Sequence, residues 1–376
     1  MTYLKDDDQK RLDELKAYIG DQYKTFLGYP CSGHFDYTPL FDLLQYPINN
    51  VGDPFAPSTY RVNTKDFERE VLAWFGEITH APPDQFWGYV TNGGSEGNLY
   101  GLYLAREIHP DGMVYYSEDT HYSVNKNLRM LRIPSIMIRS QSNGEMDYRD
   151  LEESIRIHRE LPPIIFANIG TTMREAIDDV PTIRSILKSL AIPRSYIHCD
   201  AALCGMTLPF IQGAPDWDFH AGIDSLSISG HKLIGSPIPC GIVLARKGNV
   251  DRIARSIEYV GTLDTTVTGS RNGITPVFLW YAIRREGKEG FARLVESCLE
   301  TARHAISRFA ECGIQAWRNP HAITVVFAKP PQCVLDKWQI AVSGDQAHII
   351  CMPHVTRELV DELARDLETA RAKGTL

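Results

Sequence analysis

The chain has 376 residues, and its 39 Lys and Arg against 47 Asp and Glu give a formal net charge of −8. This acidic balance leaves no basic stripe for a nucleic-acid backbone, and no apolar run approaches the roughly 18 residues of a membrane span. Residues 1–10 are polar and do not resemble a signal peptide, so we expect a cytoplasmic protein. The eight scattered cysteines form no C-x-x-C pair, which predicts free thiols and no metal site.

Two amphipathic helices are predicted before the first strand. Residues 5–24 place Leu12, Leu15, Ile19 and Tyr23 on one helical face. A connector rich in Pro and Gly follows at 28–60. A second helix, started near Thr64, continues to about residue 78.

Short apolar segments alternate with helical patterns from residue 86 onward. The predicted strands cover 86–91, 113–116, 135–138, 164–169, 196–199, 225–228 and 241–245, and helices are predicted at 97–108, 147–160 and 181–190. This alternation predicts an α/β fold with a mostly parallel sheet of seven strands. After residue 276, a helical region, one strand at 323–327 and a last helix from Thr356 predict a small α+β domain. We therefore expect an N-terminal helix and connector at 1–60, a large domain at 61–276 and a small C-terminal domain at 277–376.

Four segments at predicted strand ends carry chemistry, because ligands of such sheets bind at the carboxyl ends of the strands. The first is Thr91-Asn92-Gly93-Gly94-Ser95-Glu96-Gly97-Asn98. Its adjacent Gly93 and Gly94, its Ser95 hydroxyl and the start of a helix suit a phosphate. A plain strand-to-helix turn would use the same residue types.

The second and third segments supply a carboxylate and an amine. Asp200 follows a strong strand, where a carboxylate needs a cationic partner such as a protonated pyridine nitrogen, and the small Ala202 leaves room for a flat ring. A helix N-cap or a structural ion pair is the alternative for Asp200. Lys232 lies in Ser229-Gly230-His231-Lys232, after another strand, where desolvation would make it a usable nucleophile. A surface lysine is the alternative.

The fourth segment adds His121, which follows the strand at 113–116 and could stack on a planar ligand. A single His is more often a hydrogen-bonded structural residue. Together the segments supply an anion cradle, a carboxylate for a ring nitrogen, a stacking group and an amine that bonds to an aldehyde. One cofactor needs all four, so the sequence predicts a site for pyridoxal 5′-phosphate (PLP).

The sequence resembles the PLP-dependent group II amino-acid decarboxylases, and among them most closely the bacterial histidine decarboxylases. The resemblance covers residues 28 to about 353 and rests on the segments at 87–94, 120–123, 166–172, 229–232, 235–241 and 269–273. It implies the aspartate-aminotransferase-like fold (fold type I) and decarboxylation of an L-amino acid. It also implies an obligate homodimer whose subunits share active sites.

The resemblance implies roles for individual residues as well. Lys232 matches the lysine that binds PLP covalently, Asp200 the partner of the pyridine nitrogen, and His121 the residue on the ring face. Tyr259 matches a mobile-loop tyrosine that returns a proton to Cα. Further matches lie at the phosphate or its linker (Gly94, Ser95, Ser229 and His231), near the ring 3-oxygen (Thr171) and, from the partner subunit, at the phosphate (Ser270).

The substrate stays open between two amino acids. Most of the chain matches histidine decarboxylases, which favours L-histidine and its product histamine. The connector around Phe55 and Tyr60 is more similar to plant serine decarboxylases, which would give ethanolamine. Ile274, the third predicted pocket residue, stands where both groups usually have His, and this removes a polar contact.

Other classes share this kind of cofactor site. An aminotransferase would need an Arg for the substrate carboxylate in the small domain, for which Arg318 is a candidate. A retro-aldol lyase and a PLP-binding protein without catalysis are the remaining alternatives. The presence of Lys232, Asp200, His121 and Tyr259 together favours an enzyme.

Overall fold

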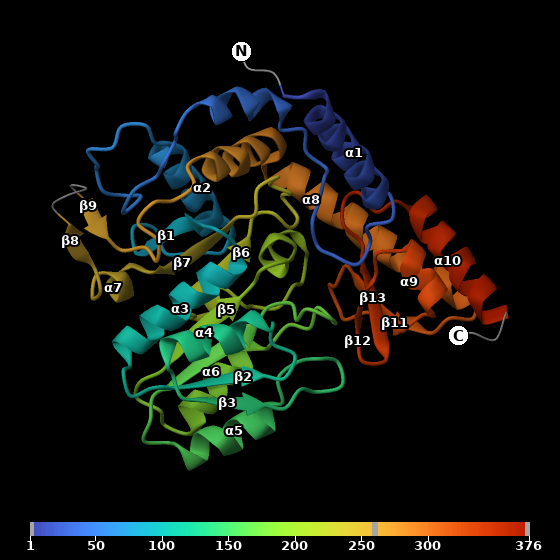
Figure 1. Ribbon diagram of the computed structural model, residues 1–376. Coiled ribbons are helices and arrows are strands. Elements are labelled where there is room, and N and C mark those ends of the chain that lie inside the picture. The colour runs from blue at the N-terminus through green and yellow to red at the C-terminus, as the bar shows by residue number, and fades with distance from the viewer. Residues whose placement is uncertain (1–3, 258–261, 373–376) are drawn as a thin grey trace.

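The computed structural model describes residues 4–257 and 262–372. Figure 1 shows a large sheet flanked by helices and, beyond it, a small sheet beside the C-terminal helices. The helices are α1 (Asp6–Tyr23), α2 (Lys65–Ile78), α3 (Gly94–Ile108), α4 (Ser123–Leu131), α5 (Tyr148–Ile157), α6 (Val180–Ser189), α7 (Lys247–Val250), α8 (Ile274–Glu311), α9 (Gln332–Lys337) and α10 (Arg357–Ala372). None of these described helices is both long and apolar enough to cross a bilayer.

The large sheet contains the seven strands predicted from the sequence, in the order β1-β7-β6-β5-β4-β2-β3. They are β1 (Phe86–Thr91), β2 (Met113–Ser117), β3 (Ser135–Ile138), β4 (Pro163–Asn168), β5 (Tyr196–Asp200), β6 (Ser225–Ser229) and β7 (Gly241–Arg246). The pairings from β3 through β2, β4 and β5 to β6 are parallel, and β7 is antiparallel to both β6 and β1. All strands except β7 therefore end at the same edge, and the prediction of a mostly parallel sheet is confirmed.

Apolar side chains cover both faces of this sheet, as expected for parallel strands. Every residue of β4 and β5 is buried. One apolar cluster packs with α3 and α4, and a second contains side chains of α2, α5, α6 and α8. The sheet is thus a rigid layer between helices, and its carboxyl edge is the place where polar strand-end residues meet.

The C-terminal part contains more strands than the sequence predicted. The expected strand is β11 (Thr324–Ala328), which joins β10 (Ala316–Trp317), β12 (Ala341–Ser343) and β13 (Gln346–Ile350) in an antiparallel sheet. A two-stranded sheet of β8 (Arg255–Ile257) and β9 (Thr262–Asp264) is also unpredicted. Most of these strands have only two or three residues, too few for a period-2 pattern. The division at 276/277 stays a prediction.

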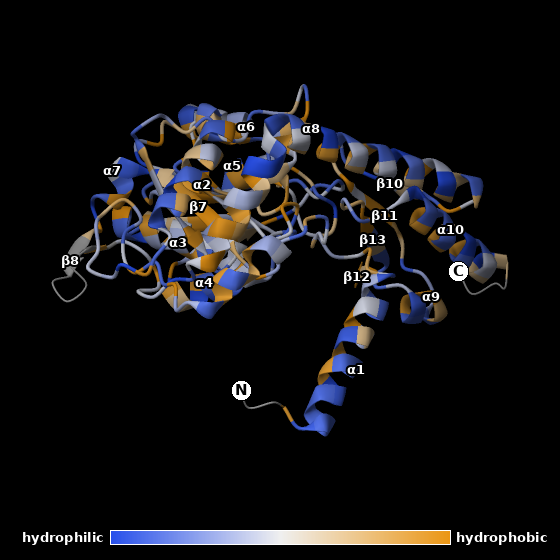
Figure 2. Ribbon diagram, turned by 90° about the horizontal axis from the view of Figure 1, so that it is seen from above, coloured by the Kyte–Doolittle hydropathy of each residue, from blue (hydrophilic) through white to orange (hydrophobic). Residues whose placement is uncertain are grey.

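The predicted N-terminal helix forms α1, but its apolar face is uncovered. No residue of α1 is buried, and Leu12, Leu15 and Ile19 are 42%, 52% and 55% exposed. Figure 2 shows α1 extending away from the body of the molecule. In the single chain, the apolar face identified from the sequence therefore points largely to solvent.

Candidate active site

A cavity of about 450 Å³ lies at the carboxyl edge of the large sheet. The small sheet closes it from the other side through Thr324 of β11, Ala341 of β12 and Ile350 of β13. The strand ends bring to it most of the residues predicted from the sequence: Gly94, Ser95, His121, Thr171, Asp200, Ala202, Ser229, His231 and Lys232.

The loop that enters α3 presents backbone to the cavity. Gly93 has φ +139° and ψ 175°, a conformation that residues with a Cβ avoid. The Glu96 carboxylate holds the loop by accepting hydrogen bonds from the Asn92 backbone N–H at 2.9 Å and from its side-chain amide at 2.6 Å. A Cβ on Gly94 would lie 2.9 Å from Ser229 Oγ and crowd the space. Because the first N–H groups of a helix lack intrahelical acceptors, this end of α3 suits an anion.

Asp200 ends β5 and lines the cavity with only 8% of its surface exposed. Its Oδ2 accepts a hydrogen bond from Asn98 Nδ2 at 2.7 Å, and its Oδ1 accepts one from the Ala202 backbone N–H at 3.1 Å. Both donors are neutral, so they orient the carboxylate without cancelling its charge. A nearly buried carboxylate held in this way favours a cationic group of a ligand.

Lys232 follows β6 and lines the same cavity as Asp200. Desolvation lowers the pKa of its ammonium group, and the nearby Asp200 carboxylate partly offsets this by raising it. The Ser32 backbone N–H donates to the Lys232 carbonyl at 3.2 Å and fixes the chain from which the side chain extends. A lowered pKa increases the fraction of neutral amine, which is the nucleophilic form.

His121 lies just before α4 and also lines the cavity. Its Nδ1 is 2.8 Å from Ser123 Oγ and accepts a hydrogen bond from the Ser123 backbone N–H at 3.3 Å. Burial lowers the pKa of this imidazole; Asp200 acts in the opposite direction, and Lys232 lowers the pKa further. With Nδ1 acting as an acceptor, the neutral ring carries its proton on Nε2.

The chemistry of these groups fits PLP. The start of α3 with Ser95, Ser229 and His231 suits a phosphate, and Asp200 suits a protonated ring nitrogen. Lys232 supplies an amine for the aldehyde. The groups that PLP requires therefore line one cavity, although they come from different strand ends.

Four predicted residues lie outside this cavity in the single chain. Ser270 is exposed and accepts a hydrogen bond from Asn49 Nδ2 at 3.1 Å. Phe55 and Tyr60 are also exposed, and the Tyr60 hydroxyl donates to a backbone carbonyl of the connector at 2.9 Å. Ile274 is buried in the apolar core at the first position of α8.

Tyr259, the predicted proton donor, lies outside the described residues. The strands on either side of it, β8 and β9, pair with each other in antiparallel fashion. Its place relative to the cavity therefore stays a prediction.

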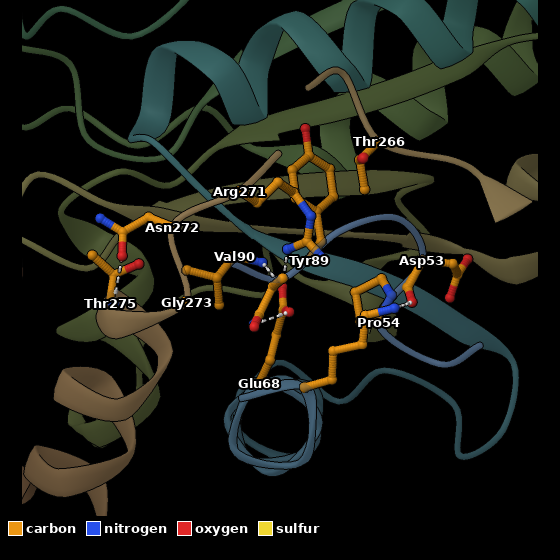
Figure 3. Close-up of polar contacts among 12 residues, drawn as sticks. Asp53, Pro54, Glu68, Tyr89, Val90, Thr266, Arg271, Asn272, Gly273 and Thr275 are labelled. Atoms are coloured by element: carbon orange, nitrogen blue, oxygen red, sulfur yellow. Dashed lines mark hydrogen bonds and ion pairs between the residues drawn. The ribbon is translucent and has the colours of Figure 1, made fainter. Parts of the chain in front are cut away.

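A buried ion pair holds the connector against the segment that contains Ser270 (Figure 3). Arg271 pairs with Glu68 of α2, and both side chains are almost fully buried. Glu68 also accepts hydrogen bonds from the Val90 backbone N–H and from Asn50 Nδ2, each at 2.8 Å. Backbone hydrogen bonds from connector residues 50–53 to residues 263–271 run alongside. This network determines where the exposed Ser270 lies.

Sequence reasoning missed several residues that line the cavity, namely Tyr29, Cys31, Asn98, Asn168 and Thr324. Asn98 had an available signal, because it follows Gly94 by four positions and lies on the same face of α3. Asn168 ends β4 as Asp200 ends β5, so its place in the strand was a second signal. Tyr29 and Cys31 belong to the irregular connector, where no periodicity indicates orientation.

A separate polar cluster lies outside the cavity. His80, Asp218 and His220 place potential metal ligands within 4.8 Å of one another. His80 Nδ1 is 2.7 Å from Asp218 Oδ2, and Asp218 Oδ1 accepts a hydrogen bond from the His220 backbone N–H at 2.9 Å. The two imidazole rings stack with centroids 4.1 Å apart. The hydrogen bonds and the ring stacking explain why the three residues lie close together, and we assign no metal to them.

The fold and the cavity define a PLP-dependent enzyme of fold type I. The sequence profile of the pyridoxal-dependent decarboxylase conserved domain matches residues 40–327, and the chain belongs to this family. It is 50% identical over 364 residues to a histidine decarboxylase of Morganella morganii, with 96% of each chain covered. A histidine decarboxylase of Mesorhizobium japonicum is 46% identical over 360 residues, covering 96% of this chain and 97% of the relative.

Solved structures agree with this assignment. An L-methionine decarboxylase from Streptomyces sp. 590 superimposes with a TM-score of 0.86 at 26% identity, over 97% of this chain and 96% of that chain. A glutamate decarboxylase from Lactobacillus brevis, at 16% identity and a TM-score of 0.81, shares the fold. The chain is therefore a PLP-dependent amino-acid decarboxylase, and the sequence-based prediction of the cofactor and of this reaction class is confirmed.

Proposed function

We propose that this chain decarboxylates L-histidine to histamine and carbon dioxide with PLP as its cofactor. The observation that supports L-histidine as the substrate is the similarity to relatives named histidine decarboxylase, which extends over 96% of this chain at 46–50% identity. The fold alone does not select a substrate, because enzymes named for methionine and glutamate share it. L-Serine is the second candidate, favoured by the connector around Phe55 and Tyr60.

Each sequence-predicted residue that lines the cavity has a place in this proposal. When bound, PLP supplies an aldehyde that bonds to amines and a protonated ring that takes up the electron pair left by the departing carboxylate. Lys232 would bind the cofactor through Nζ, Asp200 would keep the ring nitrogen protonated, and His121 would stack on the ring. Gly94, Ser95, Ser229 and His231 would hold the phosphate, Thr171 would serve the ring 3-oxygen, and Ala202 would leave room for the ring.

The protein groups also act on the substrate. Apolar side chains such as Leu203 and Ile350 line the cavity and exclude water, which favours loss of a charged carboxylate. Lys232 would hold the cofactor through its side-chain amine, and the same amine would exchange with the substrate amine on entry and with the product amine on release. Tyr259 delivers a proton to Cα as general acid.

In Tyr259→Phe we expect cofactor binding to persist and turnover to fall or to shift toward transamination, measured by absorbance and product analysis. Unchanged kinetics would remove Tyr259 from the mechanism.

We also propose that the enzyme works as a homodimer. The apolar face of α1 is about half exposed, and burial of the exposed part of each such side chain would stabilise an interface by about 1 kcal/mol. Phe55, Tyr60 and Ser270 are likewise exposed and outside the cavity of their own chain. A partner subunit would cover α1 and receive Ser270 at its phosphate site.

A substrate panel tests the proposal. The purified protein, saturated with PLP, is assayed for carbon dioxide release from L-histidine, L-serine, L-methionine and the other common amino acids. We expect kcat/KM for histidine to exceed the next value by at least about a hundredfold, because a site built for a polar ring rejects substrates without it. Serine as the best substrate would overturn the choice of histidine. Stoichiometric keto acid without carbon dioxide would indicate an aminotransferase.

A further inference from the structure

A series of buried hydrogen bonds leads from Asp200 through Asn98, which also lines the cavity, to His198, Ser225 and Tyr196. Asn98 Nδ2 donates to Asp200 Oδ2 at 2.7 Å, and Asn98 Oδ1 lies 3.0 Å from His198 Nε2. His198 Nδ1 lies 2.7 Å from Ser225 Oγ, which accepts a hydrogen bond from the Tyr196 hydroxyl at 2.9 Å. The four residues that follow Asp200 in this series are 0–2% exposed, namely Asn98, His198, Ser225 and Tyr196. These hydrogen bonds connect three neighbouring elements, α3, β5 and β6.

The chemistry of the groups determines which of them donates and which accepts in each of these hydrogen bonds. An ionised carboxylate only accepts hydrogen bonds, so Asn98 must turn its N–H₂ toward Asp200 and its carbonyl toward His198. His198 Nε2 must then carry a proton and donate it to that carbonyl. Burial lowers the pKa of His198 to about 3, so the ring is neutral and its Nδ1 is an acceptor for the Ser225 hydroxyl. Every donor therefore points toward Asp200.

The fold reserves space for this histidine. A Cβ on Gly101 of α3 would lie 2.1 Å from His198 Nδ1, so only glycine at this position lets the helix pass so close to the ring. The ring of Phe166, the neighbour of His198 on the adjacent strand β4, packs beside it with centroids 5.3 Å apart. The imidazole is thus fixed by packing, and its Nε2–H decides which way the Asn98 amide turns. Without that proton donor, the amide is free to flip and direct its carbonyl at Asp200.

We propose that His198, acting through Asn98, is a positioning residue that holds the Asp200 carboxylate in the orientation that pairs with the ring nitrogen of the cofactor. The inference rests on the proposed function only in the pairing of Asp200 with that nitrogen. It requires neither histidine as substrate nor Tyr259 as acid. His198 is two positions before Asp200 on β5, with its side chain on the same face of the sheet.

The test compares PLP with its 1-deaza analogue, in which a carbon replaces the ring nitrogen. Dissociation constants of both are measured by titrating the full-length apo-protein. We expect His198→Phe to weaken binding of PLP by about tenfold or more, since hydrogen bonds to charged groups are the strong ones. Binding of the deaza analogue should change by less than about twofold, because it makes no ion pair with Asp200. His198→Gln keeps an N–H donor toward Asn98 and should bind PLP nearly as the wild type does.

Two further variants keep the test decisive. Asn98→Leu removes the donor to Asp200 directly and should reproduce the selective loss if His198→Phe does not fold. Phe166→Leu loosens the packing around His198 without changing any donor, and it should leave the ratio of the two dissociation constants unchanged. Equal weakening of PLP and the analogue in His198→Phe and Asn98→Leu, or no weakening of either, would overturn the inference. Wild-type protein that binds PLP normally but does not act on histidine would overturn only the proposed substrate.

Discussion

Removal of the Glu68 carboxylate should destabilise the protein far more than removal of an exposed carboxylate from the same helix. Glu68 is 0% exposed and is an acceptor for Arg271, the Val90 backbone N–H and the Asn50 amide. In Glu68→Ala the Arg271 guanidinium, 4% exposed, keeps its charge and loses its anion. The two neutral donors lose their acceptor at the same time.

The size of this effect follows from burial. Deleting one partner of a buried ion pair costs about 3–5 kcal/mol, and each stranded buried donor adds about 1–3 kcal/mol in a non-additive way. We therefore expect Glu68→Ala to lower the free energy of unfolding by at least about 4 kcal/mol. Glu77, also on α2, is the matched control: it accepts from Lys288 Nζ at 2.7 Å, but its side chain is 64% exposed. Glu77→Ala should cost less than about 1 kcal/mol.

The assay is urea unfolding at equal protein concentration and saturating PLP. Glu68→Gln, which keeps the size of the side chain, serves if the alanine variant does not fold. The double variant Glu68→Leu with Arg271→Met leaves no buried charge alone and should recover part of the loss. Equal unfolding midpoints for the two single alanine variants would refute the reasoning, because burial would then not determine the cost.

Three other predictions concern the cofactor, pH and assembly. Lys232→Ala should abolish the cofactor adduct that borohydride reduction traps, and an adduct retained elsewhere in the chain would contradict the assignment. His198 titrates near 6.5 when unfolded but has its pKa lowered to about 3 by burial when folded, so protons favour the unfolded state as the pH falls from about 6.5 toward 3. Between pH 7 and pH 5 the free energy of unfolding, measured by urea titration, should therefore fall by about 2 kcal/mol less in His198→Gln than in the wild type. His34 is exposed, and His34→Gln, the control, should show the same pH dependence as the wild type. Paired Leu15→Asp and Ile19→Asp substitutions on α1 should convert the proposed dimer to monomers in sedimentation experiments, and an unchanged mass would remove α1 from the proposed interface.

The large sheet was predictable because its strands are short, nearly continuous apolar runs separated by helical patterns. The first strand was predicted with both of its observed ends, Phe86 and Thr91. The start of α3 was predicted at Gly97 but lies at Gly94, because the low helix propensity of glycine hides a beginning that the strand end and the packing impose. In the small sheet only β11 was predicted; β10 and β12 have two and three residues, too few to show a pattern, and the five-residue β13 was missed as well.

The cavity was predictable to the extent that its residues stand at strand ends. Asp200, Lys232 and His121 follow buried strands, and a parallel sheet brings such positions to one edge. Ile274 illustrates the limit: it was expected in the substrate pocket, whereas in the single chain it is buried in the core at the start of α8. A one-residue shift along a helix changes the face on which a side chain lies, and local sequence does not record that choice.

The amino-acid sequence alone determined the alternation of strands and helices and the kinds of chemical group that follow each strand, because both are local properties of the chain. Only the tertiary structure decided which of these groups meet. The pairing of Glu68 with Arg271 joins residues 203 positions apart, and the contact of Asn98 with Asp200 joins residues 102 positions apart. Such contacts depend on strand order, on register and on the packing of helices against the sheet, which arise from the whole chain together.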